Sequence, residues 1–411
     1  MSRANPSQPK ENSPFTPGQP APPEVFTGRT EEIKRLRRCI LQTAGGKPQA
    51  VFLCGERGLG KSSLARFGEF LVLQDNPMIP TDVKFMSAYN TCGACKNVTD
   101  ICKIVVQNLT AEISEESRLE KARKLLARYI EDITVPLPGF RLNVKLKRSP
   151  EELADLRLNL PDIISDLWKI MQEKKKGIMI VLDEVNGITS QPDFANFIKS
   201  VWEDLGARHV PVLLMLVGLE QRLTDLIEAN ESVGRIFDRI LLQPLSKDDV
   251  KSFFRKAFDR VNLCATSEAE EFLANLSGGY PVMMHELGDA TFWENTDDTV
   301  DKNDALIGVV AAAQRVGEKY FSTQVYREVQ SDSYRRILFH TVAETAFPGE
   351  IKRSELQESL PGEDAKTLDN FFTRMVSLEV MRRKRLGVYE YTYPMFPLYL
   401  CLERKIQEAA K

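Results

Sequence analysis

The segment Gly55-Glu56-Arg57-Gly58-Leu59-Gly60-Lys61-Ser62 decides the fold, because it joins the apolar run 50–54 to an amphipathic stretch that carries Leu64 and Phe67. A strand that passes through a glycine-rich turn into a helix is the setting in which proteins bind nucleotide phosphates. The glycines let backbone N–H groups point inward, Lys61 brings positive charge to the β- and γ-phosphates, and the Ser62 hydroxyl can ligate Mg²⁺. We therefore predict a phosphate-binding loop whose nucleotide contacts are Gly55, Gly58, Leu59, Gly60, Lys61, Ser62 and Ser63.

Two adjacent carboxylates end a second apolar run, Ile178-Met179-Ile180-Val181-Leu182-Asp183-Glu184. Such a run predicts a buried strand that presents both acids at the C-terminal edge of a parallel sheet, where ligands of α/β proteins bind. We expect Asp183 to hold Mg²⁺ together with Ser62, and Glu184 to polarise the water that attacks the γ-phosphate. With Lys61, this pair favours an ATPase (ATP + H2O to ADP + phosphate) over a protein that only binds ATP.

Five short apolar runs are separated by helical patterns, which predicts an α/β fold: a parallel sheet with helices on both faces. The runs lie at residues 50–54, 83–88, 177–182, 211–217 and 239–243.

Composition and periodicity divide the chain into four predicted parts. Seven of its 22 prolines precede residue 24, and a segment of this kind buries too little apolar surface to order itself. A helical pattern follows the last apolar run, and the C-terminal part carries helices before a strand-like segment. The expected parts are a flexible tail (1–24), an ATPase core (25–245) with an insertion at about 115–150 that contains a hairpin over 134–147, an α-helical lid (246–330) and a winged helix (331–411).

The assembled motifs resemble those of AAA+ ATPases, specifically the prokaryotic group related to origin-recognition initiators and to the STAND switch ATPases. Besides the phosphate loop and Asp183-Glu184, three segments carry the resemblance. They are Phe26-Thr27-Gly28-Arg29, Gly234-Arg235-Ile236-Phe237-Asp238-Arg239 and Gly278-Gly279-Tyr280-Pro281. The resemblance covers residues 25–402 and implies a P-loop NTPase core, a helical lid and a C-terminal winged helix.

The resemblance also implies roles for individual residues. Arg29 would lie beside the adenine and ribose, although an arginine at a helix start is also an ordinary structural feature. Arg239, or else Arg235, would reach the γ-phosphate of a neighbouring subunit as an arginine finger, although either arginine alone can equally be solvated or ion-paired. Pro281 would pack near the base, and a packed core role is the simpler interpretation of His285.

Two departures from the AAA+ pattern leave two functions open. Leu214-Met215-Leu216-Val217-Gly218 has no polar sensor residue, and Pro281 stands where a second sensor arginine is usual. The first hypothesis is an AAA+ ATPase, slow or stimulated by a partner, whose nucleotide state controls self-assembly and binding to DNA or protein. The second is a STAND-like switch, gated by ATP and ADP, that acts with a separate protein effector, for example in antiviral defence.

The formal net charge of −3 excludes a chain that binds nucleic acid through its overall charge, though not one with a local basic patch. Arg382-Arg383-Lys384-Arg385 is such a patch, and we leave open whether the winged helix contacts double-stranded DNA or a protein. We also expect a homo-oligomer to form on ATP binding.

No apolar run has the length of a membrane span, and no secretory signal is evident at the N-terminus, so we predict a cytoplasmic protein without a membrane partner. Seven cysteines, an odd number, argue against a disulfide framework. Cys92-Gly93-Ala94-Cys95, with Cys102 beyond, has no fourth Cys or His nearby to complete a structural zinc site. A redox pair remains open, and incidental thiols in a loop are the simpler interpretation.

Overall fold

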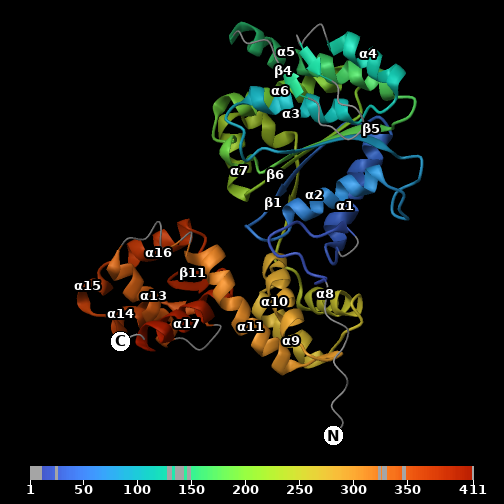
Figure 1. Cartoon of the computed structure of the whole chain (residues 1–411). Coiled ribbons are helices and arrows are strands. Elements are labelled where there is room, and N and C mark those ends of the chain that lie inside the picture. The colour runs from blue at the N-terminus through green and yellow to red at the C-terminus, as the bar shows by residue number, and fades with distance from the viewer. Residues whose placement is uncertain are drawn as a thin grey trace. The chain divides into compact units, whose positions relative to one another are not determined.

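The computed structural model describes residues 12–23, 26–126, 132–134, 143–145, 150–322, 325, 331–344 and 349–409 of the 411-residue chain (Figure 1). The chain folds as two compact units, Pro20–Gln243 and a second that joins the N-terminal residues up to Gln19 to Pro244–Lys411. Among the described residues, none of the helices combines the length and the apolar character that a membrane crossing requires.

A five-stranded sheet organises the first unit. All its neighbouring strands are parallel, in the order β2-β5-β6-β1-β7. β5 and β6 are buried along their whole length, as apolar strands covered on both faces must be. The strands are β1 (Gln49–Cys54), β2 (Phe85–Thr91), β5 (Gly177–Asp183), β6 (Val212–Gly218) and β7 (Asp238–Leu241).

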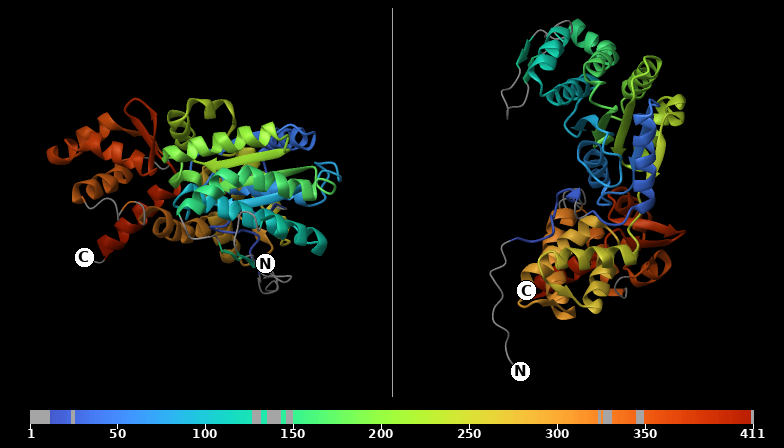
Figure 2. Two further views of the ribbon diagram at one scale, coloured as in Figure 1. Left: turned by 90° about the horizontal axis from the view of Figure 1, so that it is seen from above. Right: turned by 90° about the vertical axis from the view of Figure 1, so that its right-hand side faces the viewer.

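Helices cover both faces of this sheet (Figures 1 and 2). α1 and α2 pack on one face, and α3, α5 and α6 pack on the other, where they enclose the main apolar core. The predicted parallel α/β fold is therefore confirmed. The helices are α1 (Thr30–Ala44), α2 (Lys61–Leu73), α3 (Val98–Ala111), α4 (Glu116–Leu126), α5 (Pro150–Met171), α6 (Pro192–Ala207) and α7 (Glu220–Ala229), with the 3₁₀ turns η2 (Val185–Gly187) and η3 (Glu231–Arg235).

Between α4 and α5, a short hairpin interrupts the α/β alternation. Its antiparallel strands are β3 (Asp132–Thr134) and β4 (Asn143–Lys145). This hairpin begins and ends two residues before the one expected over 134–147, and the residues that connect its strands lie outside the described ones.

The lid of the second unit is mainly helical. It differs from the all-α expectation by one short parallel pair, β8 (Cys264–Ala265) with β9 (Thr299–Val300). Its helices are α8 (Lys247–Asp259), α9 (Ser267–Ser277), α10 (Pro281–Glu294), α11 (Lys302–Val316) and the π-helical η4 (Gly317–Ser322).

The C-terminal part has the element order of a winged helix. Its three-stranded sheet is antiparallel and ordered β10-β12-β11. The elements are α13 (Asp332–Glu344), β10 (Ile351–Lys352), α14 (Arg353–Ser359), α15 (Gly362–Ala365), α16 (Leu368–Ser377), β11 (Met381–Arg385), β12 (Val388–Tyr391) and α17 (Met395–Ala409).

The N-terminal segment differs from the expected flexible tail where it is described. Phe15 is only 4% exposed and packs against Phe258, with ring centroids 5.2 Å apart. The backbone N–H of Thr16 donates to Nδ1 of His285 at 3.0 Å. One buried aromatic ring therefore orders a proline-rich stretch whose composition alone predicts disorder.

Candidate functional site

The phosphate loop lies between the end of β1 and the start of α2, as predicted. Gly55, Gly58 and Gly60 have φ angles of 148°, 77° and 83°, which side-chain-bearing residues rarely adopt. A Cβ on Gly55 would also lie 2.8 Å from the carbonyl oxygen of Leu242. Gly60 caps α2 without a side-chain hydrogen bond, so the helix directs its first N–H groups at the loop, an arrangement suited to an anion.

Lys61 folds back over the loop that it follows. Its Nζ donates to the carbonyl oxygens of Gly55 at 2.9 Å and Glu56 at 2.7 Å. Both acceptors are neutral, so these bonds hold the ammonium group at the loop without cancelling its charge. Its position suits a contact with phosphate oxygens.

Arg29 supports the loop from behind. Its side chain is buried, and its guanidinium donates to the carbonyl oxygens of Leu59 at 2.9 Å and Gln243 at 2.5 Å. The expected contact with adenine and ribose stays a prediction. These hydrogen bonds also give Arg29 a structural role, because they link the phosphate loop to the segment that follows β7.

Asp183 ends β5 and Glu184 follows it, at the same sheet edge as the phosphate loop, with β6 between β5 and β1. Asp183 is 5% exposed, and its Oδ1 accepts the backbone N–H of Glu184 at 2.9 Å. The Glu184 carboxylate lies directly over Gly93, where a Cβ would come within 2.5 Å of Oε2. These two carboxylates can hold a hard cation and polarise a water.

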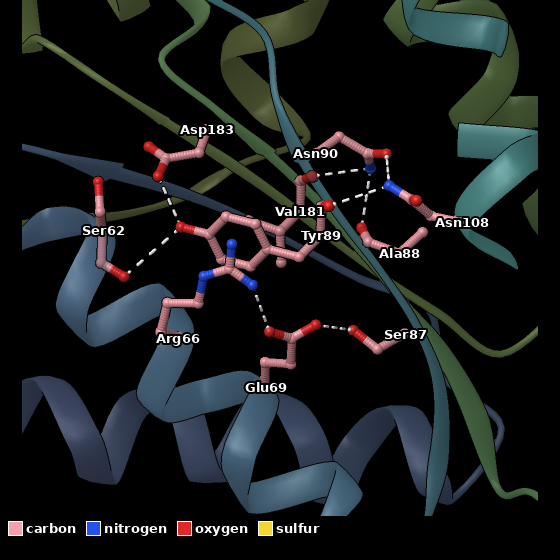
Figure 3. A network of polar contacts seen from close by, with 10 residues as sticks. All are labelled: Ser62, Arg66, Glu69, Ser87, Ala88, Tyr89, Asn90, Asn108, Val181 and Asp183. Carbon is pink, nitrogen blue, oxygen red and sulfur yellow. Dashed lines mark hydrogen bonds and ion pairs between the residues drawn. The ribbon is translucent and has the colours of Figure 1, made fainter. Parts of the chain in front are cut away.

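Tyr89 is a site residue that the sequence analysis missed (Figure 3). Its hydroxyl donates to Oδ2 of Asp183 at 2.6 Å and lies 3.5 Å from the carbonyl oxygen of Ser62. Burial, and then the adjacent Asp183 charge, raise the pKa of the Tyr89 hydroxyl, so this group stays protonated and donates. Only the order of the strands, which places β2 beside β5, reveals the contact.

Asn186 is a second residue that was missed. It lies in η2, and its Oδ1 accepts the backbone N–H of Leu219 at 2.8 Å, directly after β6. The sequence of β6 offers no polar sensor, yet Asn186 brings an amide to the end of that strand. The sequence signal that could have identified Asn186 is its position two residues after Glu184.

Ser62 and Ser63 open α2. The Ser63 hydroxyl accepts the backbone N–H of Ala21 at 3.0 Å, which places residues 20–23 over the start of this helix. A cavity of about 390 Å³ lies between these residues and α2. A Mg²⁺-bound nucleoside triphosphate fits the features described above: the glycine-rich loop, the start of α2 without a side-chain cap, and the side chains of Lys61, Ser62 and Asp183. The individual contacts stay predictions.

Arg239 and Arg235, the two candidate arginine fingers, have different surroundings. Arg239, on the edge strand β7, pairs with Glu220. Arg235 ends η3 on the surface, and its side chain makes no hydrogen bond or ion pair with another described residue. A contact of either arginine with the γ-phosphate of a neighbouring subunit stays a prediction.

Pro281 begins α10 in the second unit, so its expected contact with the base stays a prediction. His285, one turn later, is buried, and this burial lowers the pKa of its imidazole to about 4. It is therefore a neutral core residue, in line with the simpler interpretation.

Cys92 and Cys95 form a tight turn, in which the N–H of Cys95 donates to the carbonyl oxygen of Cys92 at 2.9 Å. Across the described part of the chain, no three or more His, Cys, Asp or Glu side chains gather as a metal-ligand group.

Comparison with known proteins matches residues 25–226 to a family model described as an AAA ATPase domain. This part of the chain is an AAA ATPase domain. No curated protein matches the chain.

Two solved structures share the fold of this chain. The Walker-type ATPase PABY2304 of Pyrococcus abyssi is 17% identical, with a TM-score of 0.55, and the match covers 92% of this chain and 97% of that one. The Aeropyrum pernix ORC2 protein in its ADP form is 13% identical, with a TM-score of 0.52 and coverages of 94% and 96%. The chain thus has the fold of origin-recognition-type AAA+ ATPases, as the resemblance implied.

Proposed function

We propose that this AAA ATPase domain binds ATP with Mg²⁺ and hydrolyses ATP slowly, and that its nucleotide state controls self-assembly and partner binding. One observation carries the proposal: Asp183, the last residue of β5, and the adjacent Glu184 lie at the sheet edge that also holds the phosphate loop. A protein that only binds nucleotide needs the loop but has no use for a second carboxylate over Gly93.

In this proposal each residue has one task. Backbone N–H groups of the loop and Lys61 bind the β- and γ-phosphates, while Ser62 and Asp183 hold the metal. Bound Mg²⁺ would neutralise charge that develops on the phosphate oxygens. Glu184 accepts a proton from the attacking water, and Arg239 of a second subunit stabilises the charge at the γ-phosphate.

The Glu184→Gln variant tests the assignment of the general base. Loss of the carboxylate removes the proton acceptor but not the phosphate contacts, so we expect ATP turnover to fall about 100-fold or more with ATP affinity preserved. Release of phosphate and equilibrium binding of ATP measure the two effects.

Glu228→Gln, an exposed change on α7, is the matched control and should turn over ATP at the rate of the unchanged protein. Unchanged turnover in Glu184→Gln would show that another group acts as the base.

A STAND-like switch is a second candidate, favoured by contacts inside the second unit. The Tyr280 hydroxyl, in the Gly279-Tyr280-Pro281 turn, accepts from Arg382 of the wing at 3.1 Å. The Tyr280 ring meets the Tyr393 ring edge-on, with centroids 4.8 Å apart. These contacts support a winged helix that docks on the lid turn. ADP that copurifies with the protein, together with negligible basal turnover, would favour this switch over a freely cycling ATPase.

The basic residues of the wing have less positive charge available for DNA phosphates than the sequence indicates. Arg382 pairs with Glu390, Arg385 with Glu350, and Lys384 with both acids. Phosphate groups would have to displace these carboxylates, which reduces the net gain in binding. These ion pairs therefore favour a protein over DNA as the partner of this domain. An assay of binding to duplex DNA tests the alternative.

A further inference from the structure

We propose that Tyr89 is a positioning residue for the metal site, because it fixes the Asp183 carboxylate while contacting the helix that follows the phosphate loop. The inference rests on the proposed function, in which Asp183 is a metal ligand. It adds a residue from outside the two sequence motifs that form the site.

The contact with Asp183 has the geometry of a strong bond. At 2.6 Å, the distance from the Tyr89 hydroxyl to Oδ2 lies in the range of O–H donors paired with a charged carboxylate. The other oxygen, Oδ1, accepts the backbone N–H of Glu184. Each oxygen thus has its own donor, and the carboxylate plane cannot rotate without breaking one of these bonds. Groups that orient a metal ligand in this way usually affect metal affinity strongly.

The phenol ring is itself held by α2 (Figure 3). The Arg66 guanidinium lies over the ring, with its central carbon 3.3 Å from the ring centroid. Glu69 fixes Arg66 through an ion pair of 2.9 Å, and the other Glu69 oxygen accepts from Ser87 of β2 at 2.8 Å. The helix that starts at Lys61 therefore holds Tyr89 in place.

The backbone on both sides of Tyr89 is also fixed. The Asn108 side chain, on α3, donates to the Tyr89 carbonyl oxygen at 3.1 Å and to Oδ1 of Asn90 at 2.8 Å. The Asn90 amide in turn donates to the carbonyl oxygen of Val181 on β5 at 3.0 Å. Backbone, ring and hydroxyl are each held by a different element, and only the hydroxyl contacts a residue of the proposed metal site.

Tyr89→Phe removes this hydroxyl and leaves the ring. We would measure the affinity for a fluorescent ADP derivative in EDTA and in saturating Mg²⁺, and compare the ratio between variants. The ratio should fall about tenfold in Tyr89→Phe, while the affinity in EDTA should change less than about twofold, because the phosphate loop is untouched. A residue that only stabilised the fold would shift the unfolding temperature and leave this ratio unchanged.

Tyr320→Phe is the matched control, because Tyr320 also donates to a buried carboxylate, that of Glu286, at 2.9 Å in the second unit. It should keep the ratio of the unchanged protein. Arg66→Gln is a second variant that spares the hydroxyl, and weakening the stack should lower the ratio about two- to fivefold. Asp183→Asn should abolish the Mg²⁺ dependence.

An unchanged ratio in both Tyr89→Phe and Arg66→Gln would overturn the inference while the proposed function stood. An unchanged protein that bound no nucleotide in EDTA or in Mg²⁺ would overturn the proposed function, and the inference with it.

Discussion

Glu184 has a backbone conformation that few residues other than glycine adopt, with φ 59° and ψ 43°. This left-handed conformation costs of the order of 1–3 kcal/mol and is found most often at functional sites. Here it turns the chain sharply after β5 and brings the carboxylate over Gly93. The strain and the missing side chain at position 93 thus act together to orient the proposed general base.

Gly93→Ala tests this orientation. The added methyl would lie 2.5 Å from Oε2 of Glu184, so the carboxylate must move. We expect ATP turnover to fall between about 10- and 100-fold, since a displacement near 1 Å costs that much at a catalytic group. ATP affinity should stay close to that of the unchanged protein, and a phosphate-release assay with parallel binding measurements checks both.

Gly206→Ala is the control, because a Cβ at that helical position of α6 meets nothing within 4 Å. Equal turnover in both alanine variants would contradict the proposed orientation of Glu184.

The N-terminal segment acts as an added element of the lid. Phe15 inserts between α8 and α10, and its ring lies so close to Gly288 that a Cβ there would come within 2.2 Å of it. Three phenylalanines of α8 and His285 of α10 surround the ring. The absence of a side chain at position 288 makes room for Phe15, so the two positions are matched to each other.

Phe15→Ala should lower the free energy of unfolding of the second unit by about 3 kcal/mol, because it empties a buried aromatic site. Urea denaturation followed by circular dichroism measures the change. Gln19→Ala, an exposed position in the same segment, should leave the midpoint unchanged. A Phe15→Ala midpoint equal to that of Gln19→Ala would mean that the segment contributes nothing to lid stability.

In the proposed assembly, one subunit would complete the site of the next. Arg239 lies on β7, the edge strand of the sheet, and half of its side chain is exposed although Glu220 pairs with it. An exposed ion pair is weak enough to be exchanged for a γ-phosphate of another chain. The geometry is therefore compatible with a finger that acts between subunits.

Mixing two inactive variants tests this action in trans. Arg239→Ala and Glu184→Gln should each turn over ATP about 100-fold more slowly than the unchanged protein. In a mixed assembly, some interfaces join an intact Arg239 to an intact Glu184, so the mixture should recover a measurable fraction of the activity. Light scattering should show that Glu184→Gln gains mass with Mg-ATP. A mixture no more active than its components, in protein that does assemble, would reject Arg239 as the finger.

Much of the fold was accessible from the sequence because each signal is local. Apolar runs and helical periodicity predict the strands and helices, and a glycine-rich turn between them predicts the loop at residues 55–62. The β2 strand begins two residues after the predicted start at 83 and extends to Thr91. The difference arises because polar Asn90 is paired inside the sheet by contacts that no local pattern contains.

The sequence by itself determined the chemical groups: a phosphate loop, a pair of carboxylates and candidate arginines, each placed by a short motif. The tertiary structure decided which distant residues support them. Tyr89 meets Asp183 because β2 lies beside β5, and Arg29 binds the loop because α1 begins near Leu59. Phe15 is buried because α10 has a glycine opposite its ring. Strand order and packing partners join residues far apart in the chain, and only the folded structure brings them into contact.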